Sequence, residues 1–135
     1  LNQAQSVLKS ALASRNEILQ NSESDVLELV LNIAQKVIKT EILMNKKIIV
    51  NVVKNALRHL GEQAEVHIHV HPNEVDILHA SLSELKEIVL DIVLDPDPNI
   101  EPGGCIVYSL AGSIDSQVAT QFETIRKNLL AVAES

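Results

Sequence analysis

The stretch that decides the fold reads DPDPNIEPGGCIVYSLAGSIDSQVATQ and spans residues 95–121. Its first 18 residues hold three of the four glycines and three of the four prolines of the whole chain. The paired glycines, Gly103 and Gly104, supply backbone conformations that other residues reach only with strain. A glycine pair, an apolar run at 105–110, Gly112 and then a helical pattern predict a fixed β-to-α corner, not a flexible linker.

The composition limits both the size of the protein and its partners. A chain of 135 residues forms one modest domain, or a smaller domain with an appendage. Although 46% of it is hydrophobic, Tyr108 and Phe122 are the only residues of the Phe, Tyr and Trp classes, so the core must be aliphatic. The net charge of −7 opposes a phosphate-tracking surface, and so few aromatic rings offer little stacking for bases. A nucleic-acid partner is therefore not expected.

Signals for compartment and membrane are few. The single cysteine, Cys105, cannot form an intramolecular disulfide. No apolar run approaches the roughly 20 residues that span a bilayer, and no signal segment is present. Because the chain begins at Leu1 and not at Met, we expect a fragment of a longer protein, cytoplasmic and lacking a membrane span.

Residues 1–24 are predicted to be the end of a coiled-coil stalk. A heptad register extends over more than four repeats, and seven of its ten core positions are apolar. Two interpretations stay open: one helix packed on its own domain, or a coiled coil that pairs two chains. In the second, the dimer contacts are Leu1, Leu8, Leu12, Leu19 and Val26.

Residues 25–135 are predicted to form one globular α+β domain. A helical stripe over Asp25–Leu43 is followed by a second helix that starts at an Asn45 N-cap and ends at Gly61. The strict alternation at 64–71 predicts a half-buried strand, and Pro72 suits the first turn of a third helix.

The later elements complete a small sheet. The aliphatic run at 88–94 predicts a strand covered on both faces and stopped by the Asp-Pro repeat. A strand at 105–110, a tight turn, a short strand at 113–115 and a final helix to about residue 133 follow. The expected order, α-α-β-α-β-β-α, places helices on a mostly antiparallel or mixed sheet.

Three alternating histidines are the one candidate metal site. His67, His69 and His71 share a strand face about 6.7 Å apart. Paired histidines at this spacing can bind zinc, but three in a row span too far for one ion, and no carboxylate motif accompanies them. We expect no metal and interpret the three as a polar strand face.

No catalytic constellation is found. Cys105 lies in a predicted strand, where a buried cysteine behaves as a small hydrophobe. The acidic residues Asp91, Asp95, Asp97 and Glu101 are interpreted as a solvated loop. The glycine pair lacks the Lys-Ser/Thr of a phosphate-binding loop. The chain is therefore expected to act by binding, without a cofactor.

The breaker-rich stretch also carries a family resemblance. Its motifs are Asp95-Pro96, Pro102-Gly103-Gly104-Cys105, Gly112-Ser113-Ile114-Asp115 and Thr120-Gln121-Phe122-Glu123, leading into Ile125 and Leu129. Together with the segments 33–38, 52–60 and 70–74, they resemble the C-terminal domain of the FliH/SctL family. These proteins are the stators, or peripheral stalks, of flagellar and virulence-associated type III secretion ATPases. The resemblance covers roughly residues 25–131.

The resemblance implies a function and partners. Family members form homodimers through a coiled coil, bind the N-terminal region of the export ATPase, hold it at the inner-membrane secretion apparatus and regulate it. It also implies a contact between the missing N-terminal region and a cytoplasmic sorting-platform or C-ring protein. A virulence-type system is preferred. The alternatives are a peripheral-stalk E-type subunit of a vacuolar-type rotary ATPase, whose C-terminal domain has a similar fold, and a His-rich metal-binding domain.

Specific roles are expected for residues of the last third. The fold-signature positions are Pro102, Gly103, Gly104, Cys105, Gly112 and Asp115, and Asp115 is expected to cap the last helix. That helix should turn Val118, Phe122, Ile125 and Leu129 inward. The expected partner-binding residues are Gln121, Phe122, Arg126 and Lys127.

Overall fold

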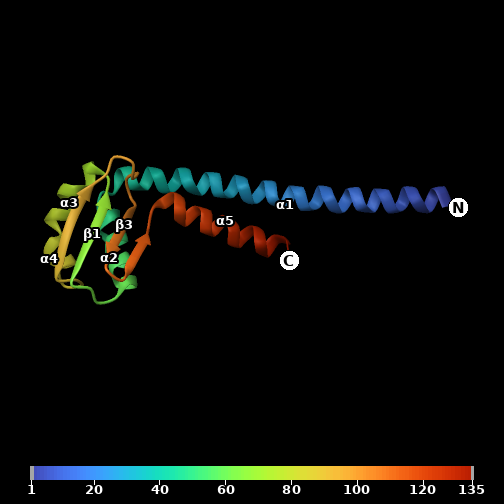
Figure 1. Cartoon of the computed structure of the whole chain (residues 1–135). Coiled ribbons are helices and arrows are strands. Elements are labelled where there is room, and N and C mark those ends of the chain that lie inside the picture. Colours follow the sequence, from blue (N-terminus) through green and yellow to red (C-terminus); the bar gives the residue numbers. More distant parts are fainter. Residues whose placement is uncertain (1, 135) are drawn as a thin grey trace.

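The computed structural model describes residues 2–134, with side chains to residue 132, as one long helix projecting from a small α/β head (Figure 1). Leu1, expected in the coiled coil, lies outside the described residues. The elements are α1 (Asn2–Met44), α2 (Ile48–Leu60), β1 (Glu65–Val70), the 3₁₀ turn η1 (Pro72–Glu74), α3 (Val75–Ala80), α4 (Leu82–Leu85), β2 (Asp91–Pro96), β3 (Cys105–Ser109), β4 (Gly112–Asp115) and α5 (Val118–Glu134).

The four described strands form one mixed sheet in the order β2-β1-β3-β4. β1 and β2 are parallel, and the connection between them runs through η1, α3 and α4, as a parallel pair requires. β3 pairs antiparallel with β1, and β4 returns beside β3 as a hairpin. The prediction of a small mixed sheet with helices is confirmed. Each of the four strands predicted at 64–71, 88–94, 105–110 and 113–115 has a counterpart in the sheet, and the order written as α-α-β-α-β-β-α omitted one strand of the hairpin.

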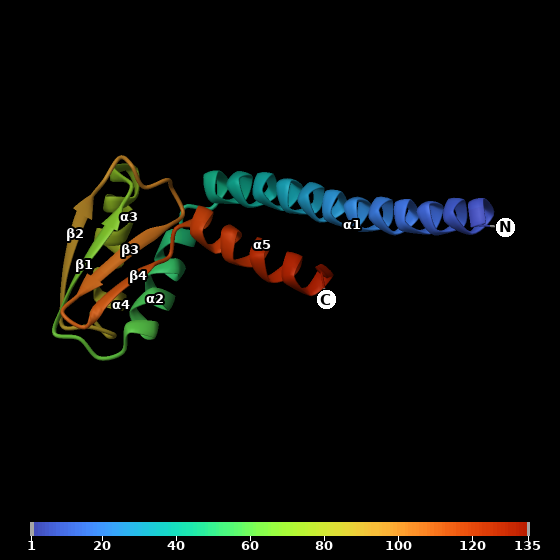
Figure 2. The same ribbon diagram turned by 45° about the vertical axis from the view of Figure 1, so that its right-hand side comes forward.

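One face of the sheet carries the core. The inward residues of β1, Val66, Ile68 and Val70, are buried under Leu57 of α2 and Leu78 of α3, within a single aliphatic cluster. Helices α2, α3 and α4 lie on this side of the sheet, whereas α1 and α5 project away from it (Figures 1 and 2). The other face is open, because the alternate residues His67, Val93 and Tyr108 are exposed.

The stalk is one unbroken helix of 43 residues, α1, about 64 Å long. No break in the helix marks the boundary expected at residue 24; only the packing changes there. Every residue from 2 to 23 is exposed, and Ser24 is the first that is partly buried. From there α5 runs back along α1, buries Leu31 and places Arg126 Nη1 3.4 Å from Glu28 Oε2.

Two predicted boundaries at helices are wrong. The second helix begins at Ile48 and not after Asn45, whose side-chain Oδ1 accepts a hydrogen bond from Lys47 N at 3.1 Å inside the preceding turn. Gly61 does end that helix, as predicted, with a positive φ of 77°. The third helix is split at Ser81 into α3 and α4, yet Leu78 and Leu85 are buried as the periodicity predicted.

The strand predicted at 88–94 is shifted and is not covered on both faces. β2 begins at Asp91, because its parallel register pairs Asp91 with Glu65, and it extends through Pro96. It lies at the edge of the sheet, where a proline without an N–H group is tolerated. Its residues are exposed or half-buried in alternation. The aliphatic run misled the prediction because Val89 belongs to the core before the strand begins.

The glycine corner is where stalk and head meet. Gly103 has a φ of 90°, and its N–H donates to Glu74 Oε1 at 2.8 Å. A Cβ at Gly103 would lie 2.5 Å from the end of the Ile42 side chain on α1. A Cβ at Gly104 would lie 2.7 Å from Gln117 Cα, just before α5. The backbone of this corner therefore lies closer to Ile42 of α1 and to the start of α5 than side chains at positions 103 and 104 would permit.

Gly104→Ala is expected to lower the free energy of unfolding by about 2 kcal/mol, because its methyl group would press on the backbone of Gln117 and Val118, which cannot rotate away. Urea denaturation measures the change. Gly61→Ala is a reference for the other cost of replacing a glycine, since nothing lies within 4 Å of its added Cβ but its φ of 77° strains a side chain. A loss at Gly104 of less than about 0.5 kcal/mol would contradict the steric argument.

Candidate functional site

The open sheet face holds two of the three alternating histidines beside acidic groups. His67 Nδ1 lies 3.2 Å from Asp95 Oδ2, and His67 Nε2 lies 3.2 Å from Glu65 Oε1. His69 Nε2 lies 3.5 Å from the same Asp95 oxygen, and its ring meets Tyr108 edge-on at 4.8 Å. The interpretation of Asp91 and Asp95 as part of a solvated loop is wrong, because both lie in β2. The parallel register of β1 and β2 brings Asp95 beside the histidines.

His71 has a different role from His67 and His69. Its Nδ1 accepts a hydrogen bond from Asn73 N at 3.1 Å and so caps the turn that starts at Pro72. Within residues 2–134, no three ligating side chains come together in a group that could hold a metal ion. The geometry therefore offers no support for the metal alternative.

Cys105 lies in β3 with no exposed surface. Burial, and to a lesser degree the carboxylates of Asp115 and Glu74, raises the pKa of its thiol to about 12. Burial also raises the pKa of the Glu74 carboxyl, while the hydrogen bond from Gly103 partly offsets that rise. A thiol in this setting is neutral at physiological pH and has no access to a substrate.

The other signature positions are structural in their contacts. Pro102 is exposed beside Gly103, and Gly112 begins β4 in the hairpin. Asp115 Oδ1 accepts from Gln117 N at 2.9 Å, and Oδ2 accepts from Thr120 Oγ1 at 3.1 Å. The carboxylate thus holds the first turn of α5 from three residues ahead of the helix.

The expected partner-binding residues of α5 differ in accessibility. Phe122 is only 8% exposed, and Arg126 is half-buried in its ion pair with Glu28. Gln121 and Lys127 are exposed. Ile125 and Leu129, expected to face inward, are 47% and 38% exposed, because α5 leaves the head and packs along α1.

A groove between α2 and α5, lined mostly by apolar residues, reaches these residues. It consists of two adjoining hollows of about 250 and 730 Å³ that share Val52 and Gln121. The first is lined by Ile38, Glu41, Ile42, Ile48, Val52, Gly103, Val118, Gln121, Phe122 and Ile125. The second is lined by Val52, Asn55, Ala56, His59, Ile114, Ser116 and Gln121.

Sequence reasoning missed this groove. Its walls come from α1, α2, β4 and α5, which are far apart in the sequence. No pattern within one segment could show that α5 leaves the head and opens a furrow beside α2. The residues that convert a core face into a groove are therefore visible only in the tertiary arrangement.

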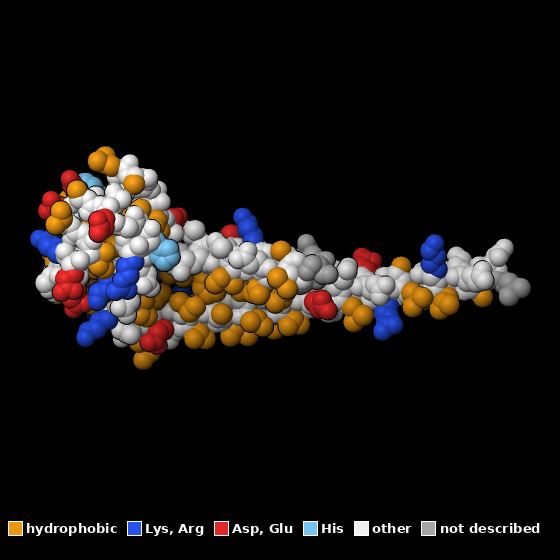
Figure 3. All heavy atoms as spheres, turned by 90° about the horizontal axis from the view of Figure 1, so that it is seen from below, with side chains coloured by type: hydrophobic (Ala, Val, Ile, Leu, Met, Phe, Trp, Pro, Cys, Tyr) orange, Lys and Arg blue, Asp and Glu red, His pale blue; other side chains and the backbone are white. Residues whose placement is uncertain are grey.

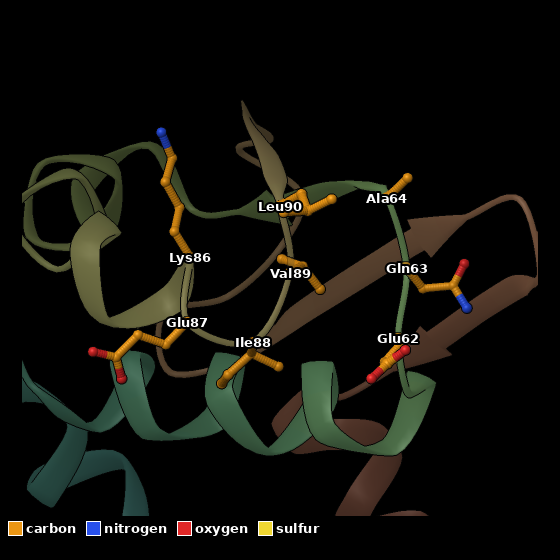
Figure 4. A pocket seen from close by; sticks show the side chains of 8 residues that line it. All are labelled: Glu62, Gln63, Ala64, Lys86, Glu87, Ile88, Val89 and Leu90. Atoms are coloured by element: carbon orange, nitrogen blue, oxygen red, sulfur yellow. The ribbon is translucent and has the colours of Figure 1, made fainter.

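A third hollow, of about 390 Å³, lies at the far end of the head, beyond α2 and α4 (Figure 4). The side chains of Lys86, Glu87 and Glu62 point away from one another in this view, while Ile88 and Val89 lie between them. Catalysis needs ionisable groups that converge on one reacting atom. This hollow has no such convergence.

No helix within residues 2–134 has the length and hydropathy needed to cross a membrane. The long helix α1 has exposed Leu8, Leu12, Leu19 and Val26, the expected dimer contacts, along its stalk.

Comparison with known proteins gives two matches. Residues 1–125 match the family described as flagellar assembly protein FliH. The chain is also 30% identical over 124 residues to the flagellar assembly protein FliH of Borreliella burgdorferi. The aligned stretch covers 90% of this chain and 40% of that protein. The chain thus spans less than half of this relative. Both matches name flagellar assembly, so the preference for a virulence-associated system is not upheld.

We expect the folded protein to resist thiol reagents at pH 8. With a pKa of about 12, only about 10⁻⁴ of the Cys105 side chains are ionised at that pH, and the sulfur has no exposed surface. Absorbance after addition of a chromogenic disulfide measures the reaction, and the same assay in 6 M urea is the control in which one thiol should react at once. Stoichiometric labelling of the folded chain within seconds would refute the assignment.

Proposed function

The chain belongs to the FliH family of flagellar assembly proteins, and from that premise we propose that it is a non-catalytic stator segment that binds and regulates the export ATPase. In this proposal the head holds the N-terminal region of the ATPase, and the stalk pairs two copies. The assembly lies in the cytoplasm against the inner-membrane apparatus. Contact with a cytoplasmic ring protein is assigned to sequence outside residues 1–135, since the relative is longer than the part that matches.

The observation that carries the ATPase proposal is the α2–α5 groove. It follows α2, whose 13 residues span about 20 Å, the length of between three and four turns of a bound helix. Most of its lining residues are apolar, and its polar residues Glu41, Asn55, His59 and Gln121 are exposed, while Ser116 is half-buried. An amphipathic helix laid in such a groove buries its apolar face and leaves its polar face in water.

The stalk supports pairing of two copies. Residues 2–23 have no buried or half-buried member, and an isolated helix this exposed is unstable in water. The four apolar positions Leu8, Leu12, Leu19 and Val26 recur on one side of it. A second copy of α1 would cover this side as a parallel coiled coil.

Gln121→Trp tests the groove, because Gln121 is exposed at the junction of the two hollows and a larger side chain there would block both. We expect the affinity for the cognate export ATPase to fall about tenfold, measured by titration with the full-length ATPase. The same loss should follow removal of the N-terminal region of the ATPase.

Glu123→Trp is the matched control, since Glu123 is also exposed on α5 but lines neither hollow. Wild-type affinity for Gln121→Trp would refute the groove as the docking site. No complex at all with the unaltered protein, together with no effect on the ATPase rate, would refute the stator proposal. Phe122 is unsuitable for this test, because at 8% exposure its replacement reports on folding.

Leu12→Asp with Leu19→Asp tests the pairing, because two carboxylates would be placed in the apolar seam of the stalk. We expect the dissociation constant of the dimer to rise about a hundredfold, measured by sedimentation equilibrium. Ser10→Asp with Asn21→Asp adds the same charge on the opposite side of the helix and should leave the dimer intact. Equal behaviour of the two double variants would contradict a seam at Leu12 and Leu19.

A further inference from the structure

We propose that the dimer changes architecture along its length: beyond residue 24 the second copy packs against α1 and α5 together, so that α1, α5 and their partner copies form a four-helix bundle. This inference rests on the proposed pairing of two stalks and specifies what the second copy covers. Four observations carry it: the course of the apolar stripe, the position of α5, the exposure of one flank of α5 and the total exposed area.

The apolar stripe of α1 continues past the two-helix stalk. With an advance of about 100° per residue, Leu8, Leu12, Leu19, Val26, Val30, Ile33 and Val37 fall within a sector of about 60°. All seven are exposed. A core helix of a single head would not keep four large aliphatic residues in water over three turns, so the section from Val26 to Val37 also has a partner.

The spacing of the stripe changes where α5 begins to cover α1. A strict heptad continued from Leu8 and Leu12 would place Leu29 and Lys36 in the seam. The exposed stripe instead uses Val30 and Val37, so that it steps by four, three and four residues from Val26 through Val30 and Ile33 to Val37. This is again heptad spacing, in a register shifted by one residue. Helices of a four-helix bundle pack with the same spacing.

α5 lies beside the stripe and does not cover it. Leu31, the residue of α1 that α5 buries, is about 130° around the helix from the centre of the stripe. On α5, Arg126 meets Glu28 on the flank away from the stripe. Ile125 lies on the other flank of α5, next to Leu129, and both are exposed.

The two surfaces merge into one. Seen from below, hydrophobic side chains form a continuous band over α1 and α5 beside the head and continue more sparsely along the outer stalk (Figure 3). A helix seated on the stripe between Val26 and Val37 would therefore also contact the exposed flank of α5. By two-fold symmetry its own α5 would contact α1 in return, as an isologous interface requires.

The exposed area matches the size of such an interface. A compact protein of 14.8 kDa exposes about 7,000 Å², whereas this chain exposes 9379 Å². The excess of about 2,400 Å² is more than the roughly 800 Å² that a standard interface buries on one partner. Counted on both partners, it falls in the range of total area buried by permanent dimers. The occupant that fits an apolar stripe repeated along the whole stalk is a second copy of the same stalk.

Cysteine crosslinking tests the bundle. The native Cys105 has no exposed surface and stays silent as background. A tagged chain carrying Val30→Cys is co-expressed with an untagged chain carrying Leu129→Cys, and a short bis-maleimide is added to the purified dimer. We expect about tenfold more tagged–untagged product than with Lys127→Cys in place of Leu129→Cys, because only Leu129 lies on the flank beside the stripe. Circular dichroism checks that each variant keeps its helix content.

A separate arm distinguishes this inference from the pairing on which it rests. Leu12→Cys alone should form a disulfide between two copies if the stalks pair. Disulfide formation at Leu12 without product between Val30→Cys and Leu129→Cys would overturn the bundle and leave the stalk dimer standing. Equal product with Leu129→Cys and Lys127→Cys would also overturn the bundle. No product at any of these positions would overturn the dimer itself.

Discussion

Everything outside the sheet depends on the close approach of backbone at Gly103 and Gly104. The missing side chains let one short turn touch Ile42 of α1 on one side and Gln117, just before α5, on the other. The same turn is tied to the crossover of the parallel strands through the hydrogen bond from Gly103 to Glu74. Stalk, crossover and final helix are thereby fixed relative to a sheet that none of them belongs to.

The binding surfaces follow from that junction. Because α5 starts at the corner and turns away from the head, it cannot cover α2 completely, and the uncovered strip becomes the apolar groove. Because α5 then runs along only one side of α1, the stripe from Val26 to Val37 stays free for another helix. The core of the head is one cluster without aromatic rings, built from one face of the sheet and from α2, α3 and α4.

Local patterns predicted the fold where a single segment determines its own structure. The alternation from Ala64 to His71 identified β1, and Gly61 marked the end of α2, because both signals act within a few residues. The start of β2 was predicted wrongly. Pairing with Glu65, which is distant in sequence, sets that start at Asp91, whereas the aliphatic run before it has the pattern of a strand. The groove and the pairing of Asp95 with two histidines were invisible for the same reason: each joins segments whose relation only the sheet register or the corner sets.

The three-residue link between α1 and α2 has a mechanical consequence. Alone, Asn45–Lys47 would be a pivot about which the head could swing freely. The antiparallel α5 restrains that movement, because it is joined to the sheet at one end and packs against α1 over several turns. Bending at the link therefore requires α1 and α5 to slide past each other. A force on the head is consequently delivered along the axis of the stalk as a twist or a push, with little lost to bending.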